Sequence, residues 1–333
     1  MEVWPLPRLS FRGLNSIDEK RPAALITQPA VWSTVSKLVN LPLVIQAEPN
    51  HDDNEFVDYL AANLPAPVQV IYAVGDGLLV NVAKAVASAN NKPLVILPTA
   101  ISSDAPLTWI ATLNSTGGKP TERTTGPATE VVLDMGVIAS APAEARAAGI
   151  VDVLSIITGL LDWSNAAQKG RTAPETKLAP WAVSVAAGLA AQALKSAGAM
   201  GKADPEALRL LVDLLATTVH LDSQLGHRRA SQGIEHLFAN SVKADSSVSH
   251  AEKVGPGILL ASALHNKDVA GMRTALEAAG VRLNRLKPDD IRAAVMALPN
   301  YARDSNAPYT ILNDISSTDL EQALTRSTLL NQS

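Results

Sequence analysis

Short apolar runs alternate with amphipathic stretches over the first 135 residues of the chain. The apolar runs are rich in β-branched residues and predict strands at 23–27, 43–47, 68–74 and 93–98. Helical periodicity follows the first three of them, at 32–39, 55–63 and 78–89. Strands that are apolar on both faces and separated by helices form parallel sheets, so this part predicts a doubly wound, Rossmann-like α/β domain.

The pattern changes near Ser140, where strand signals fade. Ala- and Leu-rich runs with helical periodicity take over at 150–168, 180–198, 204–222, 230–242, 254–265, 268–280 and 288–298. Pro205 and Pro288 stand near the first position of two of these helices, where a missing N–H costs little. We therefore expect two domains, an α/β domain over 1–137 and an all-helical domain over 138–333, with a ligand cleft between them.

Composition and charge exclude several classes of function. The chain has 333 residues, a net charge of −4 and no cysteine. It therefore lacks the basic footprint of a nucleic-acid-binding protein, and it has neither disulfides nor thiolate metal sites. The N-terminus does not look like a signal peptide, and the apolar runs at 182–194 and 256–264 are shorter than the ~20 residues that span a membrane. We expect a cytoplasmic protein without a membrane span or a nucleic-acid partner.

Two histidines and one aspartate form a candidate metal site. His236 and His250 stand in the phrases Gly-Ile-Glu-His and Ser-His-Ala-Glu, and Asp152 lies in an otherwise apolar helical stretch. Two imidazoles and a carboxylate are a usual ligand set for a catalytic divalent metal. On one straight helix, residues 236 and 250 would lie about 21 Å apart, so the chain must turn between them. We expect a helix capped by Ser247 or Ser249 to begin there.

The structural alternative for these three residues is a surface aspartate and two histidines satisfied within the fold. A lone carboxylate in an apolar stretch needs a partner, and a cation is one candidate.

A glycine turn follows the third predicted strand. Gly75 and Gly77 allow the backbone to approach an anion at the start of the next helix, so a diphosphate would fit; a tight turn without a ligand is the alternative. Asp76 lies between them and would repel a diphosphate, unless it points outward or caps the helix.

Hydroxyl groups follow the fourth predicted strand, at the sheet edge that carries ligands in open α/β folds. Thr99, Ser102 and Ser103 are candidates to bind a phosphate, a ribose or an amide, and Asp104 is a candidate to bind a substrate hydroxyl. The alternative is a polar loop with a helix cap.

Five phrases in the same order resemble the glycerol-1-phosphate dehydrogenase branch of the superfamily of iron-type alcohol dehydrogenases, glycerol dehydrogenases and 3-dehydroquinate synthases. They lie at 97–104, 149–163, 229–236, 250–255 and 308–312. The resemblance implies the dehydroquinate synthase-like architecture, an oligomer of identical chains, and a role in phospholipid metabolism. The substrate implied is glycerol-1-phosphate, dihydroxyacetone phosphate or a close analogue.

The resemblance also implies roles for particular residues. It places the metal on Asp152, His236 and His250, with zinc as the expected ion and nickel or iron as alternatives. It places NAD or NADP across the turn at 75–77. The remaining implied contacts are Thr99 and Ser102 near the nicotinamide half, Thr108 where a serine usually stands, and Asp104 at the substrate.

Several residues depart from the family pattern. Asp76 replaces a glycine, Asn81 an aspartate, and Asn240 a substrate-contacting histidine four residues after the metal histidine. These changes predict a divergent member. A sugar-phosphate cyclase or lyase, or a protein without dehydrogenase activity, is the alternative. Glu48 follows the second strand, where an acidic group favours NAD over NADP.

Overall fold

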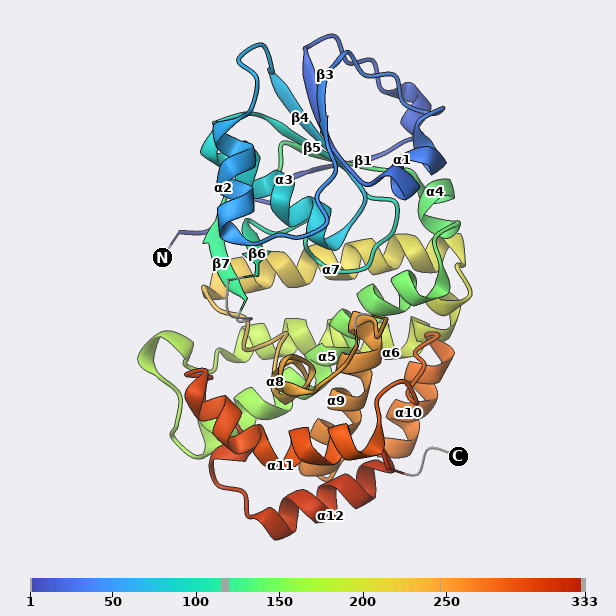
Figure 1. The fold of residues 1–333 in the computed structure, drawn as a ribbon. Helices are drawn as coiled ribbons and strands as arrows, with labels where there is room; N and C mark the ends of the chain where they lie inside the picture. Colours follow the sequence, from blue (N-terminus) through green and yellow to red (C-terminus); the bar gives the residue numbers. More distant parts are fainter. Residues whose placement is uncertain (1, 115–119, 246, 331–333) are drawn as a thin grey trace. The chain divides into compact units, whose positions relative to one another are not determined.

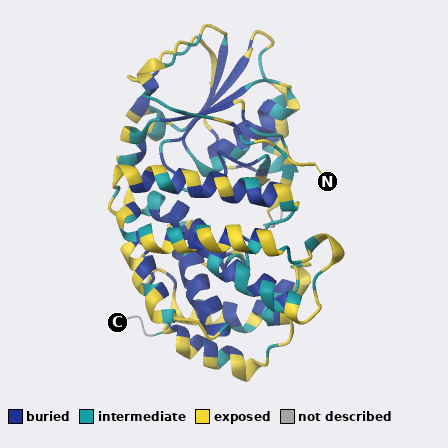
Figure 2. Ribbon diagram, turned by 180° about the vertical axis from the view of Figure 1, so that it is seen from behind, coloured by how far each residue is buried: buried dark blue, intermediate teal, exposed yellow. Residues whose placement is uncertain are grey.

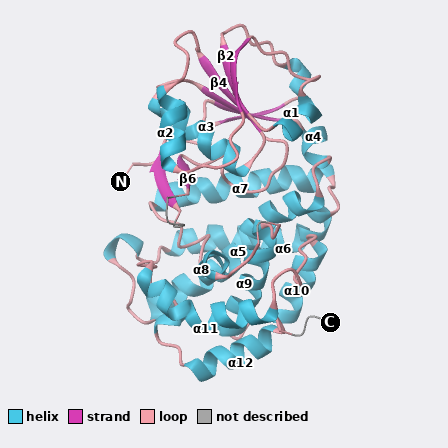
Figure 3. Cartoon of the chain, in the orientation of Figure 1, coloured by secondary structure: helices cyan, strands magenta, loops and turns pink. Residues whose placement is uncertain are grey.

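The computed structural model describes residues 2–114, 120–245 and 247–330. The chain forms two compact units, Val3–Pro142 and Ala143–Ser333, and Glu2 belongs with the second. The strands lie in the first unit and the second is built from helices (Figure 3). The α/β class of the first unit and the helical class of the second agree with the pattern of the sequence.

The first unit contains a parallel sheet of six strands within its described residues, in the order β1-β8-β5-β4-β2-β3 (Figure 1). The strands are β1 (Arg8–Phe11), β2 (Ala23–Ile26), β3 (Leu43–Ala47), β4 (Val70–Val74), β5 (Leu94–Leu97) and β8 (Glu130–Leu133). An antiparallel pair, β6 (Ile110–Leu113) and β7 (Thr121–Thr124), stands apart from it. The helices are α1 (Pro29–Val35), α2 (Asn54–Ala62), α3 (Gly77–Ala89) and α4 (Met135–Ala139), with a 3-10 turn at Leu14–Ser16.

The topology of this sheet reverses between β2 and β4. The chain passes from β2 outward to β3, returns to β4 beside β2, and then continues in the other direction to β5. The strands β2, β4, β5 and β8 are fully buried, in keeping with apolar runs covered on both faces (Figure 2). Ligands of open α/β sheets bind at such a reversal, outside the carboxyl ends of the strands. The turn at 75–77 directly follows β4 and lies at this point.

Some elements of this unit differ from the prediction. The first helix was expected over 32–39 but covers Pro29–Val35, because Pro29 takes the first helical position. The strands β1, β6, β7 and β8 were not predicted. Each has four residues, too few to show a period, and the charged sequence Thr-Glu-Arg-Thr of β7 has no apolar face.

The second unit is helical, with α5 packed against α6, α7, α8 and α9. Its helices are α5 (Ala143–Gln168), α6 (Pro180–Gly201), α7 (Pro205–Leu225), α8 (Ile234–Ser241), α9 (His250–Leu264), α10 (Val269–Ala278), α11 (Pro288–Asp304) and α12 (Ser317–Ser327), with 3-10 turns at Pro174–Thr176 and Ile311–Asn313. Pro205 and Pro288 begin α7 and α11, as expected. The helix α12 was not predicted.

The helix α5 is the one helix of the described residues that is long and apolar enough to cross a membrane by length and composition. However, 72% of its apolar window is buried inside the protein. Its hydrophobicity is therefore that of the helix around which the second unit packs.

Candidate metal centre and cofactor turn

Three helices of the second unit carry the candidate metal ligands. Asp152 lies on α5, His236 on α8, and His250 is the first residue of α9. The turn that the spacing required is present, because α9 begins with a capping box. The Ser249 hydroxyl accepts a hydrogen bond from the backbone N–H of Glu252, whose carboxylate accepts one from the N–H of Ser249. The expected cap at Ser249 is present, and it places His250 in the first turn of α9.

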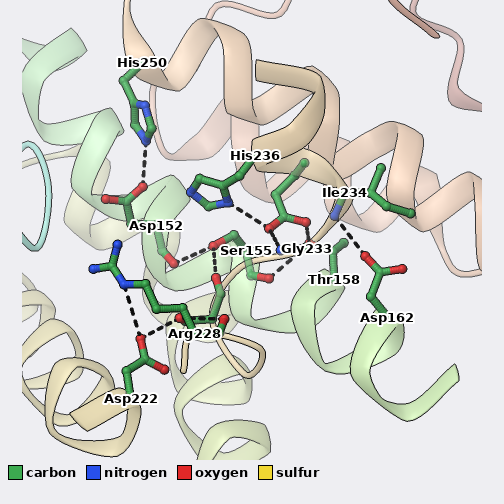
Figure 4. A network of polar contacts seen from close by, with 12 residues as sticks. Asp152, Ser155, Thr158, Asp162, Asp222, Arg228, Gly233, Ile234, His236 and His250 are labelled. Carbon is green, nitrogen blue, oxygen red and sulfur yellow. Dashed lines mark hydrogen bonds and ion pairs between the residues drawn. The ribbon is translucent and has the colours of Figure 1, made fainter. Parts of the chain in front are cut away.

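These three side chains converge (Figure 4). One ligand atom from each of Asp152, His236 and His250 lies within 4.8 Å of the others. His250 Nε2 is 2.8 Å from Asp152 Oδ1, and the centroids of the two imidazole rings are 6.0 Å apart. In a tetrahedral zinc site with bonds of about 2.0–2.1 Å, ligand atoms lie about 3.3 Å from one another. The spacing and the nitrogen and oxygen donors therefore fit a divalent metal.

A buried carboxylate, which the sequence did not single out, orients His236. Glu235 is fully buried, and its Oε1 lies 2.9 Å from His236 Nδ1. Oε1 also accepts from the N–H of Gly233, and Oε2 accepts from the hydroxyl of Thr158 at 2.7 Å. With Nδ1 held in this way, the other ring nitrogen of His236 faces Asp152 (Figure 4). A carboxylate behind a metal-binding histidine is the usual support of such ligands.

The electrostatic environment of His236 favours positive charge. Burial opposes the charged imidazolium, but the hydrogen bond and the charge of Glu235, together with the charge of Asp152, outweigh it and raise the pKa of His236. A site that stabilises an imidazolium also stabilises a cation bound in its place.

A second buried pair ties the three helices together. Asp162 Oδ1 lies 2.8 Å from His265 Nε2 at the end of α9, and Oδ2 accepts from the N–H of Ile234 at the start of α8. Burial raises the pKa of Asp162 despite these contacts. The hydroxyl of Ser155, one turn after Asp152, donates to the carbonyl of Ser231 at 2.9 Å. These contacts hold the helices of the metal ligands in one arrangement.

The glycine turn of the first unit has a conformation that requires glycine. Gly75 has φ +133° and Gly77 φ +46°. A Cβ atom at Gly75 would lie 2.4 Å from Leu79 Cδ1. Asp76 occupies the N-cap position of α3 in an extended conformation, yet its side chain makes no capping hydrogen bond. The backbone is shaped for close approach of a ligand, and the Asp76 carboxylate is not used by the helix.

Comparison with known proteins reveals the relatives of the chain. A family model described as iron-containing alcohol dehydrogenase matches residues 17–142. The glycerol-1-phosphate dehydrogenase [NAD(P)+] of Methanosphaerula palustris is 29% identical over 241 residues, which are 71% of this chain and 66% of the relative. The enzyme of the same name from Aeropyrum pernix is 28% identical, covering 80% of this chain and 75% of the relative.

Solved structures have the same fold over the whole chain. A probable glycerol dehydrogenase from Sinorhizobium meliloti has a TM-score of 0.72 at 18% identity, and covers 99% of both chains. The sulfoacetaldehyde reductase of Bifidobacterium kashiwanohense, solved with NAD+, has a TM-score of 0.70 at 16% identity and covers both chains fully. Over residues 17–142 the chain is therefore similar to the iron-containing alcohol dehydrogenase family. The sequence resemblance to its glycerol-1-phosphate dehydrogenase branch is confirmed.

The hydroxyl groups of the loop after β5 differ in whether the fold already uses them. The side chains of Thr99 and Ser102 are half-buried and make no hydrogen bond to the rest of the described chain. Thr108 is buried, and its hydroxyl accepts from Lys84 Nζ at 2.7 Å and donates to the carbonyl of Ile110 at 2.9 Å. Thr99 and Ser102 thus remain available to a cofactor, while the proton of the Thr108 hydroxyl is used within the fold.

Other residues expected near the cofactor or the substrate are also placed. Glu48 is exposed after β3 and accepts from Gln46 Nε2 at 2.7 Å. Asn81 Oδ1 accepts from the N–H of Thr112 at 3.3 Å, so this replacement for the family's aspartate holds β6. Asp104 is half-buried in the first unit, and Asn240 is exposed on α8 one turn after His236.

Proposed function

We propose that the protein is a metal- and NAD(P)-dependent dehydrogenase that acts on a small polyol phosphate. Glycerol-1-phosphate, its ketone dihydroxyacetone phosphate or a close analogue is the substrate. The observation that carries the proposal is the convergence of Asp152, His236 and His250 within 4.8 Å, on the elements where the family phrases stand. The relatives with this domain pair are named as dehydrogenases and reductases, which favours hydride transfer over the cyclase or lyase alternative.

Each residue has a definite task in this proposal. Asp152, His236 and His250 would hold the metal, and a metal bound there would supply Lewis-acid chemistry at the substrate oxygen for a hydride exchange with the nicotinamide. Glu235 keeps the proton of His236 on Nδ1 and leaves Nε2 free to ligate. Asp104 binds a substrate hydroxyl.

The cofactor contacts belong to the first unit. The turn at 75–77, with its two positive φ angles, presents backbone N–H groups to the diphosphate at the topological reversal of the sheet. Thr99 and Ser102 contact the nicotinamide half, and Glu48 accepts hydrogen bonds from the adenosine ribose, so NAD binds more tightly than NADP. Zinc is the proposed metal, and a homo-oligomer in the cytoplasm is the proposed state of the enzyme.

The experiment compares zinc-loaded wild-type protein with Asp152→Asn. The matched control is Asp213→Asn, which changes an exposed aspartate on α7. We expect the wild type and the control to bind zinc and NADH and to reduce dihydroxyacetone phosphate. We expect Asp152→Asn to keep NADH binding and to lose zinc affinity and reduction together. Turnover of Asp152→Asn equal to that of the control would refute the proposal.

Asp76 favours a second candidate function, a protein that binds metal and substrate but transfers no hydride. Its carboxylate lies in the turn offered to the diphosphate and is not used by the helix. If zinc-loaded protein binds a polyol phosphate while neither NADH nor NADPH changes its fluorescence, this second function replaces the first.

A further inference from the structure

A pocket of about 240 Å³ lies beside the candidate metal ligand His236, wholly within the second unit. One wall is formed by His236, Leu237 and Asn240 on one face of α8, together with Gly233 at its N-cap. The loop between α7 and α8 and the segment around Pro308 form other walls. His236 is shared with the candidate metal site, whereas none of the cofactor contacts described above lies in this pocket.

The pocket lining is rich in positive charge. It includes Arg228 and Arg229, and both oxygens of its one carboxylate, Asp162, are engaged with His265 and Ile234. Arg229 is buried and donates to the carbonyl of Tyr309 at 2.8 Å. A buried guanidinium such as that of Arg229 favours an anion in the space that it lines.

Arg228 extends from the same loop. Its Nε lies 3.9 Å from Asp222 Oδ2, and that oxygen accepts a closer hydrogen bond, 2.7 Å, from the hydroxyl of Ser231. The charge of Arg228 also acts on His236. Arg228 therefore connects the pocket electrostatically to the candidate metal site.

His227 supplies a neutral donor to the same pocket. Its Nδ1 accepts a hydrogen bond from the backbone N–H of Arg229 at 3.2 Å, so the neutral ring carries its proton on Nε2. Burial and the charge of Arg229 lower the pKa of His227, which favours this neutral form. The ring is held edge-on against Trp163, with centroids 5.2 Å apart.

Two side-chain amides in the lining have no hydrogen-bond partner among the described residues. They belong to Gln232 and Asn240, although the backbone N–H of Gln232 donates to the carbonyl of Arg228 at 2.8 Å. Each amide NH2 is a donor, so the pocket combines charged donors with uncommitted ones.

We propose that this pocket binds the phosphomonoester group of the substrate, with Arg228, His227 and Gln232 as donors. Arg229 is a positioning residue that fixes the loop. The inference rests on the proposed function and adds to it the place and the chemistry of the anionic end. It also explains how a chain with Asn240 in place of the family's histidine retains donors beside the metal.

The test is the substitution Gln232→Glu, which keeps the shape of the side chain and puts a negative charge into the pocket. The matched control is Gln322→Glu on α12, where the glutamine is exposed. Binding of glycerol 1-phosphate, inorganic phosphate and glycerate to zinc-loaded protein is measured by calorimetry. NADH binding to each variant is measured in parallel.

We expect Gln232→Glu to weaken the binding of both phosphates about tenfold or more, because a charge-assisted hydrogen bond is replaced by repulsion. Zinc and NADH binding stay at the level of the Gln322→Glu control. Arg228→Gln is the second variant and weakens phosphate binding in the same way.

Three outcomes overturn the inference. Phosphate affinity unchanged in both pocket variants, with NADH binding intact, would place the phosphate elsewhere and leave the proposed dehydrogenase standing. Tighter binding of glycerate than of glycerol 1-phosphate would assign the pocket to a carboxylate. Absence of both phosphate and NADH binding in the wild type would remove the proposed function together with the inference.

Discussion

The substitution Glu235→Gln isolates the electrostatic support of the candidate metal site. Glu235 is fully buried and accepts hydrogen bonds from Gly233 N–H, His236 Nδ1 and the hydroxyl of Thr158. A glutamine in the same position keeps these contacts. Its carbonyl faces Gly233 and His236, and its NH2 donates to the Thr158 hydroxyl, which can donate to the carbonyl of Ser155 at 3.0 Å. Only the negative charge is removed.

The magnitude follows from the role of the carboxylate behind a ligating imidazole. Removing such a partner usually costs 10–100-fold in metal affinity, or about 1.4–2.8 kcal/mol. The same change lowers the pKa of His236, since the hydrogen bond and the charge of Glu235 are what raise it. Protons then compete less with the metal at acid pH, so the loss of zinc affinity should be largest above the pKa of His236 and shrink as the pH falls.

The assay is competition with a chromophoric zinc chelator between pH 5 and pH 8, supported by the shift of thermal unfolding with zinc concentration. Glu130→Gln is the control, because Glu130 is a buried carboxylate of the other unit, paired with Arg8. It should lower stability without changing zinc affinity. Equal zinc affinity in Glu235→Gln and the wild type at pH 8 would show that the Glu235 charge does not support the metal site.

Three further predictions concern the first unit. Asp76→Gly should raise the affinity for NADH about tenfold, since a carboxylate near a diphosphate costs about 1–2 kcal/mol; an unchanged fluorescence titration would show that Asp76 faces away from the cofactor. Lys84→Met should lower the urea-unfolding free energy by about 1–3 kcal/mol by leaving acceptors such as Thr108 without their buried donor, and an undiminished value would contradict this role. Arg21 lowers the pKa of Glu19 from 4.5 to about 2, so this stabilisation is present above pH 4.5 and is lost as the pH falls toward 2. In Glu19→Gln, the free energy of urea unfolding should not show this loss between pH 4.5 and pH 2. A decrease equal to that of the wild type would show that Glu19 does not cause it.

Much of this architecture was predictable because its signals are local. The strand at 43–47 appeared where expected, and α5, α6 and α7 matched the long periodic runs. The candidate metal cluster required one non-local step, that His236 and His250 could share a metal only if the chain turned between them. The turn is present because Ser249 caps a new helix, α9.

What could not be predicted depends on contacts between distant segments. Glu235 stands beside His236 in the sequence, but its burial and its contact with Thr158 on another helix cannot be predicted from that position. Lys84 reads as an exposed lysine, yet it is buried against the loop that carries Thr108. Arg229 begins the family phrase at 229–236 and Arg228 directly precedes it. That both residues line a pocket follows only from the fold.

Reduction of dihydroxyacetone phosphate by NADH, followed in zinc-loaded protein and in the same protein stripped of metal, tests the proposed metal-dependent dehydrogenase. We expect turnover that depends on zinc, that returns when zinc is restored, and that is lost in His236→Ala. NADH oxidation at equal rates with and without metal, or none in protein that binds both zinc and NADH, would contradict it.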